Sequence, residues 1–319
     1  MKLRSLVVAV ALFVLSAAAV RAQDATPLYV YIDGDTNIQD LWNNIIAPQF
    51  EEAFPEYDIE VVVTRGVGGG NADIADRALA ALETGDDPQA DFLESIDVES
   101  NPAWLENDLF VELTEENVPN IANLSEAASE RLPQVTPYRG AQVLLAYNSD
   151  VVAEEDVPTT YAELIEWIQA NPGRFVYCRP DRGGSGAAMV QRAIWEVTGQ
   201  DPSLFQPGEA DPELIAQYPA AWELLASIHD SIYEGGAYPG GNLPVIELLA
   251  NGSVDMITAW SDQAIQNINL GVLPPSTRLA QLQDLPFSGG ISGGGAIPAN
   301  AANLEGALEL YNFLLTPEI

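Results

Sequence analysis

The sequence has 319 residues, of which 12 are Lys or Arg and 47 are Asp or Glu, so its formal net charge is −35. Such a charge excludes a nucleic-acid partner held by a basic surface, and no lysine follows Lys2, which excludes a P-loop or Schiff-base lysine. A single cysteine, Cys178, and a single histidine, His229, exclude an intramolecular disulfide, a Cys-based zinc site and the HExxH motif. The sequence therefore predicts neither a cofactor nor a bound metal.

The first 22 residues have the three parts of an export signal. Lys2 and Arg4 form a charged start, residues 5–20 are an apolar run of 16, and Val20 and Ala22 are small residues where a signal peptidase cleaves. The run is shorter than the roughly 20 residues that span a bilayer, and no second such stretch follows. We therefore expect a cleaved signal peptide over residues 1–22 and a soluble protein in the periplasm or elsewhere outside the cytoplasm.

Three strands alternate with two helices in the first part of the chain. β-rich runs predict strands at 28–32, 59–64 and 90–95. Helical spacing of apolar residues predicts helices at 38–46 and 72–84. The expected buried positions are Ile38, Leu41, Trp42, Ile45 and Ile46 in the first helix and Ile74, Ala78, Leu79 and Leu82 in the second. Because parallel strands need a crossover, this order predicts a parallel sheet with helices on its faces.

The same alternation restarts after residue 141 and predicts a second α/β lobe. We expect strands at 142–147, 175–178 and 254–260. We expect helices at 158–170, 183–197, 220–233, 245–250 and 303–315. A glycine-rich stretch, 289–295, precedes the last helix.

Four parts of the sequence carry motifs in a characteristic order. Residues 42–55 combine a helical pattern with the turn motif F-E-x-x-x-P, and the second strand follows. Residues 142–150 read Q-V-L-L-A-Y-N-S-D, and residues 157–164 read V-P-T-T-Y-A-E-L. Residues 180–186 read P-D-R-G-G-S-G, and the stretch 293–318 begins G-G-G-A-I-P-A-N and ends L-L-T-P-E.

These segments resemble the extracellular solute-binding proteins of ABC importers, of the two-lobed type that includes binders of maltose, iron, polyamines and thiamine. The resemblance implies an α/β fold of the periplasmic-binding-protein type II class. In that class, two doubly wound lobes are joined by a hinge and the ligand cleft lies between them. It places residues 23–141 plus 287–319 in the first lobe and residues 142–286 in the second.

The resemblance also implies a function. A receptor of this kind captures a small-molecule solute, closes around it by hinge motion and delivers it to the permease subunits of an ABC transporter in the membrane. We therefore expect a monomeric binding protein and not an enzyme.

Candidate ligand contacts follow from a rule that holds without the family. Open parallel sheets bind ligands beyond the carboxyl ends of their strands, where helix N-termini and free backbone N–H groups converge. In the first lobe the rule selects Asp33, Asn37, Gly69, Asn71, Ser95 and Asp97. In the second lobe it selects Asp181, Arg182, Gly184, Ser185 and Trp260.

The loop 179–186 has the strongest pattern of these. Four of the nine arginines that follow residue 22 lie at 174, 179, 182 and 192, and Gly184 with Ser185 begins a helix. A ligand carboxylate, phosphate or sulfonate would suit this loop. Alternatively, glycine and serine only turn and cap the helix while the arginines pair with surface acids. An anionic solute is therefore favoured by the arginines, and a cationic solute by the many acids and by the breadth of the family.

Three other positions have two interpretations each. The ring of Trp260 either stacks on a ligand or belongs to the core. Residues 33–37 resemble the start of a calcium loop, but Ile38 and Asn44 stand where such a loop needs glycine and glutamate, which favours a helix cap. Ser95 and Asp97 either meet the ligand or cap the next turn.

A secreted serine hydrolase of α/β type is the alternative function. Residues 290–294 match G-x-S-x-G, but glycines are abundant there, and His229 precedes Ser292, which is the wrong order for an α/β-hydrolase. Ser185 precedes His229 but lacks the full motif. We therefore expect no catalytic residue, and His229 is expected to be an ordinary helical histidine.

Overall fold

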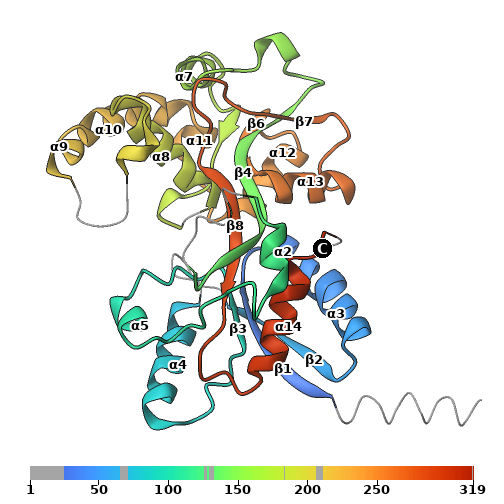
Figure 1. Cartoon of the computed structure of the whole chain (residues 1–319). Helices are drawn as coiled ribbons and strands as arrows, with labels where there is room; N and C mark the ends of the chain where they lie inside the picture. The colour runs from blue at the N-terminus through green and yellow to red at the C-terminus, as the bar shows by residue number, and fades with distance from the viewer. Residues whose placement is uncertain are drawn as a thin grey trace, which may run out of the picture. The chain divides into compact units, whose positions relative to one another are not determined.

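The computed structural model describes residues 25–64, 71–125, 128, 133–182, 184–205, 211–317 and 319 (Figure 1). The expected signal peptide, residues 1–22, and the candidate Gly69 lie outside the described residues. The chain forms two compact units: unit 1 comprises Met1–Tyr138 and Gly293–Ile319, and unit 2 comprises Arg139–Ser292. No helix of the described residues is long and apolar enough to cross a membrane.

Unit 1 is built on four strands in the order β2-β1-β3-β8. They are β1 (Thr26–Asp33), β2 (Tyr57–Thr64), β3 (Phe92–Glu94) and β8 (Gly289–Ala296). β1 runs parallel to β2 and β3, as predicted, whereas β8 is antiparallel to β3. Alternate residues of β1 enter two different hydrophobic clusters, Val30 on one face and Tyr31 on the other. β1 is therefore the buried central strand, which explains its nearly continuous apolar sequence.

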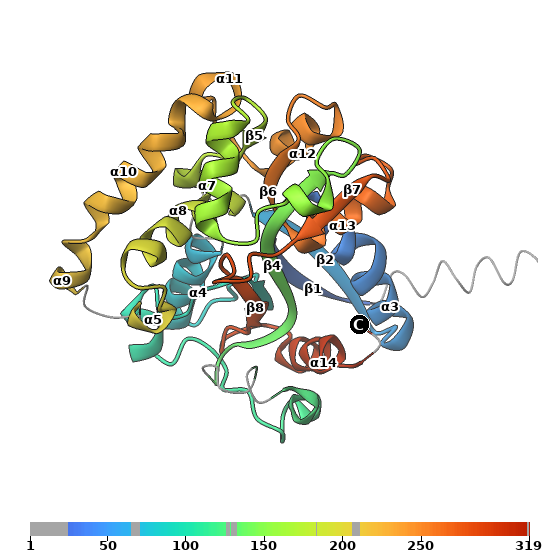
Figure 2. The same cartoon turned by 90° about the horizontal axis from the view of Figure 1, so that it is seen from above.

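Helices cover both faces of this sheet (Figures 1 and 2). One face packs against α2 (Thr36–Leu41), the π-helical turn η1 (Trp42–Ile46), α3 (Ala47–Ala53) and α14 (Leu304–Leu314). The other packs against α4 (Ala72–Thr84) and α5 (Pro102–Glu106), and a 3-10 turn, η2, spans Pro119–Asn123. Unit 1 is thus doubly wound.

The π-helical turn η1 changes which residues of the first predicted helix are buried. Ile45 was expected in the buried stripe but is 44% exposed, and the large buried side chains are Ile38, Trp42, Ile46 and Phe50. The wider turn moves the buried positions to a spacing of four, which turns Ile45 outward. In α4 the buried residues are Ala75, Ala78 and Ala81, while the larger side chains of its expected face are only partly buried.

Unit 2 has a mixed sheet made of β4 (Thr136–Asn148), β5 (Phe175–Val176), β6 (Met256–Trp260) and β7 (Thr277–Ala280). β4 is antiparallel to β6 and β7, and β5 is parallel to β6. The predicted strands lie at these places, although β5 ends two residues early, and β7 was not predicted.

The main helices of unit 2 are α7 (Tyr161–Ala170), α8 (Gly184–Val197), α10 (Tyr218–Ile228), α12 (Asn242–Ala250) and α13 (Ser261–Asn269). Shorter helical turns are η3 (Glu154–Asp156), η4 (Pro180–Arg182), η5 (Pro202–Leu204), α9 (Pro212–Ile215), η6 (His229–Ser231) and α11 (Tyr233–Gly236). The predicted helix 220–233 is wrong after Ile228, and α13 was not predicted. α8 and α10 lie side by side (Figures 1 and 2).

Candidate functional site

A buried amide joins the carboxyl ends of three strands in unit 1. Asn71, just before α4, is fully buried, and its Nδ2 donates to the carbonyl oxygens of Tyr31 (2.9 Å) and Glu94 (2.6 Å). Its Oδ1 accepts a hydrogen bond from Thr64 Oγ1 at 2.6 Å. These contacts fix the ends of β1, β2 and β3 together. Asn71 therefore positions the loops that follow these strands, and its direct contact with ligand stays a prediction.

Two carboxylates lie at the ends of neighbouring strands of unit 1. Asp33 ends β1 and is half-buried, and Glu94 ends β3 and is fully buried. Burial raises the pKa of Asp33, and the charges of Glu94 and then Asp35 raise it further, although a hydrogen bond from the Gly34 N–H acts in the opposite direction. This end of the sheet is therefore strongly negative.

Aromatic groups orient Glu94. Its Oε1 accepts a hydrogen bond from Tyr138 Oη at 2.5 Å, and Trp42 Nε1 donates to the same Tyr138 oxygen at 3.1 Å. The rings of Trp42 and Tyr138 meet edge to face, with centroids 6.3 Å apart. Glu94 was not among the predicted site residues. Its signal in the sequence is an acid at the end of an otherwise apolar strand.

The remaining candidates of unit 1 lie in loops or at helix starts. Asp35 occupies the N-cap position of α2, but its side chain makes no capping hydrogen bond, and Asn37 lies partly buried in the first turn. Ser95 has a left-handed backbone (φ 57°) and donates its N–H to Gly294 O at 2.7 Å. Asp97 is exposed, and its carboxylate accepts the N–H of Glu99, as the turn-cap alternative predicted.

In unit 2, the start of α8 is closed by internal contacts. The N–H of Ser185 donates to Asn242 Oδ1 at 3.0 Å, and the N–H of Gly186 donates to Cys178 Sγ at 3.1 Å. The hydroxyl of Ser185 is buried and donates to Thr258 O at 3.0 Å. Gly184 has a positive φ of 66°, as a tight turn into a helix requires. The backbone N–H groups of Ser185 and Gly186 therefore have partners within unit 2. Ligand contact by Gly184 and Ser185 stays a prediction.

Three of the four clustered arginines pair with carboxylates, as the alternative interpretation predicted. Arg174 Nε donates to Asp255 at 2.7 Å, and the exposed pair Arg179–Asp181 is joined at 3.0 and 2.5 Å. Arg192 is fully buried and bonds both Glu196 and Asp284 at 2.7 Å. The side chain of Arg182 lies outside the described residues.

Aromatic residues line a second part of unit 2. A pocket of about 610 Å³ lies between α8, α10 and the segment after β5, and the candidate Asp181 borders it. The other lining residues are Tyr177, Arg179, Pro180, Val190, Trp222, Leu225 and Tyr238. Trp260, at the end of β6, is partly buried and packs against the core of unit 2.

Hydrolase chemistry finds no support in these contacts. A serine nucleophile needs a base within hydrogen-bond distance. Ser185 Oγ contacts Thr258 O and Cys178 Sγ, whereas the exposed His229 bonds Tyr238 Oη at 3.0 Å through Nδ1. The side chain of Ser292 lies outside the described residues. Among the residues that the structure describes, no group of three or more His, Cys, Asp or Glu side chains could hold a metal ion.

A sequence profile described as "Bacterial extracellular solute-binding protein" matches residues 46–319. The chain belongs to this family. Protein YnjB of Escherichia coli K12 is 28% identical to this solute-binding protein over 188 residues, which cover 57% of the chain and 46% of YnjB. The match thus spans about half the length of that relative.

Solved structures show which fold this solute-binding protein shares. Iron-bound HitA from Pseudomonas aeruginosa superposes with a TM-score of 0.62 at 18% identity, covering 92% of this chain and 82% of HitA. The spermidine/putrescine-binding protein PotD from Streptococcus pneumoniae gives 0.64 at 14%, covering 92% and 79%. A periplasmic thiamin binding protein gives 0.59 at 16%, covering 92% and 79%. The fold is that of the type II periplasmic binding proteins, as the resemblance implied.

Proposed function

We propose that this solute-binding protein captures a positively charged small molecule outside the cytoplasm and delivers it to an ABC permease in the membrane. In this proposal, the strand ends of unit 1 supply the charged groups of the ligand site. The chain is exported by its N-terminal signal, acts as a monomer and performs no reaction on its solute.

The carboxylates of Asp33 and Glu94 carry this proposal. They end neighbouring strands at the edge of the sheet where open α/β sheets bind ligands. Two carboxylates this close repel one another, and a cation between them removes that repulsion. The site therefore gains more from a cationic solute than from a neutral one.

The cationic side chains of unit 2 support the same conclusion. An anionic solute would need arginines or open helix N–H groups at the strand ends. Arg174, Arg179 and Arg192 are already paired with acids, and the first amides of α8 are bonded to Asn242 and Cys178. Binding an anion there would require breaking these contacts.

The solutes in the names of the structural relatives agree with a positive charge. Iron, spermidine or putrescine, and thiamin are all cations. We propose that Asp33 contacts the charge directly, with Asn37 as a further contact, while the fully buried Glu94 adds its negative charge beside Asp33. Asn71 positions the loops of unit 1. In unit 2, Trp260 and Ser185 stay candidate ligand contacts.

Isothermal titration calorimetry tests the proposal on the chain from residue 23. Spermidine and thiamine serve as cationic probes, and citrate and glutamate as anionic ones. We expect binding of a cationic probe, weakened about 10- to 100-fold in Asp33→Asn, because that variant loses a charge-assisted contact. Glu94→Gln removes a neighbouring negative charge and should weaken binding to a smaller extent. Asp58→Asn, an exposed acid in β2, is the matched control and keeps full affinity. Binding of the anions alone, or cation binding that Asp33→Asn leaves unchanged, contradicts the proposal.

His229→Ala separates the receptor from the alternative hydrolase. Because His229 is exposed and bonds Tyr238, away from Ser185, we expect unchanged solute affinity. Turnover of an ester substrate that this variant abolishes would instead support the hydrolase.

A further inference from the structure

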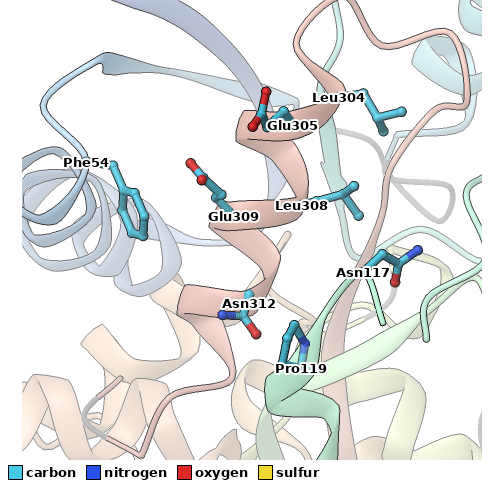
Figure 3. A pocket seen from close by; sticks show the side chains of 8 residues that line it. All are labelled: Phe54, Asn117, Pro119, Leu304, Glu305, Leu308, Glu309 and Asn312. Carbon is cyan, nitrogen blue, oxygen red and sulfur yellow. The ribbon is translucent and has the colours of Figure 1, made fainter. Parts of the chain in front are cut away.

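A second pocket lies wholly within unit 1, on the outer face of α14. Its volume is about 620 Å³, which is within the range of roughly 300–1,000 Å³ that suits a small organic ligand. Phe54, Pro119, Leu304 and Leu308 form apolar walls (Figure 3). The opposite face of α14, with Leu310 and Tyr311, is buried in the core. The pocket therefore occupies helix surface that the fold of unit 1 leaves uncovered.

This pocket is distinct from the strand ends that hold Asp33 and Glu94. Asn303, which precedes α14, donates its Nδ2 to Pro27 O at 3.0 Å, and Thr26 N donates to Glu56 O at 2.8 Å. The pocket thus borders the amino-terminal end of β1. Asp33 lies at the other end of this eight-residue strand, about 23 Å away at the usual rise per residue.

The charged groups of the pocket are acidic, and two asparagines, Asn117 and Asn312, also line it. Glu305 and Glu309 lie one turn apart on α14, and Figure 3 shows both on the side that faces Phe54, with Leu304 and Leu308 toward Asn117. Among the described residues, Oε2 of Glu309 has no hydrogen-bond partner although it is buried from solvent. Burial and the charges of Glu56 and Glu305 raise the pKa of Glu309, against a hydrogen bond with Tyr57. Among the residues that the structure describes, no arginine lines the pocket.

A ligand that meets these conditions has an apolar body and a positive charge. An ammonium group beside Glu305 and Glu309 would offset the repulsion between the carboxylates and give Glu309 Oε2 a donor. An aromatic or alkyl body would cover Phe54, Leu304 and Leu308. We propose that this pocket is a second binding site, in unit 1 alone, for a small organic cation of this kind.

Calorimetric titration with 2-phenylethylamine, which is an ammonium ion at pH 7, tests the site. The uncharged 2-phenylethanol has the same shape and serves as the matched ligand. We expect the amine to bind at least 10-fold more tightly than the alcohol. We also expect Glu309→Gln to weaken amine binding about 10-fold, whereas Glu52→Gln, an exposed acid of α3, leaves it unchanged.

A second variant assigns the binding to this pocket. The double variant Asp33→Asn/Glu94→Gln removes the carboxylates at the strand ends, so amine binding to the α14 pocket persists in it. Equal affinity for amine and alcohol, equal effects of Glu309→Gln and Glu52→Gln, or loss of amine binding in the double variant would each overturn the proposal. A thermal melt of each variant confirms that it is folded.

Discussion

The carboxyl ends of the strands differ between the two units in what their charged groups do. In unit 2, Arg179, which follows β5, is bonded to Asp181, and the amides at the start of α8 have internal partners. In unit 1 two carboxylates end neighbouring strands, and the charge of Glu94 adds to burial in raising the pKa of Asp33. The comparison shows that the partner of a charged residue, more than its type or its loop, indicates whether it is available to a ligand.

An asparagine fixes the strand ends in each unit, but the two do so to different degrees. Asn71 is fully buried and joins three strands of unit 1 through three hydrogen bonds. Asn242 is only partly buried, and its Oδ1 accepts the N–H of Ser185 and contacts Cys178 Sγ. The strand ends of unit 1 are therefore joined by buried hydrogen bonds, whereas unit 2 also depends on ion pairs.

The largest expected effect comes from breaking the buried ion pairs of unit 2. Arg192→Met removes the cation that Asp284 and Glu196 share. It also removes the N–H group that donates to the Leu285 carbonyl. Removing one partner of such a group costs about 3–5 kcal/mol. We expect this loss in the free energy of unfolding, measured by urea denaturation at pH 7.

Arg179→Met is the matched control for that substitution. Its ion pair with Asp181 is exposed on both sides, so solvent screens the interaction. We expect no measurable change in its unfolding midpoint. A loss of stability in Arg179→Met as large as in Arg192→Met would remove the distinction between buried and surface pairs in unit 2.

Substituting the two asparagines, Asn71 and Asn242, should give the next largest difference in the free energy of unfolding. Asn71→Ala removes the amide that donates to the carbonyls of Tyr31 and Glu94 and accepts from the Thr64 hydroxyl, and we expect a loss of about 2–3 kcal/mol. Asn242→Ala removes one helix-capping bond, and we expect about 1 kcal/mol. Urea denaturation of both variants checks the ranking. An equal loss in the two would mean that the strand ends of unit 1 are not held more firmly than those of unit 2.

Local patterns in the sequence predict most of the elements. The stretches that became α4 and α8 carry a helical period, and β1 is a short, nearly continuous apolar run, so packing and local propensity agree in all three. The outward turn of Ile45 was not predictable, since the π-helical turn changes the period within one helix. The short strand β7 and helix α13 contain few apolar residues, and both were missed.

The site was less predictable than the fold because its contacts are long-range. Arg174 meets a carboxylate 81 residues away, and Arg192 meets one 92 residues away. The sequence offers an arginine cluster but does not show these pairings, so anionic and cationic solutes stayed open. Glu94 was missed for the same reason, because its nearness to Asp33 depends on the pairing of β1 with β3.

The smallest expected effect concerns the stability of the folded protein as a function of pH. Substituting one acid of unit 1, Asp33, and one acid of unit 2, Glu163, should change that stability in opposite directions. The folded-state pKa of Asp33 is raised above its ordinary value of 3.8, chiefly by burial, so the folded protein gains stability as the pH falls from 7 through that raised pKa. The pKa of Glu163 in unit 2 is lowered below 4.5 by hydrogen bonds from Thr159, so its contribution to stability is present above pH 4.5 and is lost below it.

Asp33→Asn should therefore be more stable than the parent at pH 7, with an advantage that shrinks on acidification. Glu163→Gln should be less stable at pH 7, with a deficit that shrinks below pH 4.5. Thermal melts from pH 3 to pH 7 measure both differences, and the same sign in the two variants would contradict the contrast between the units.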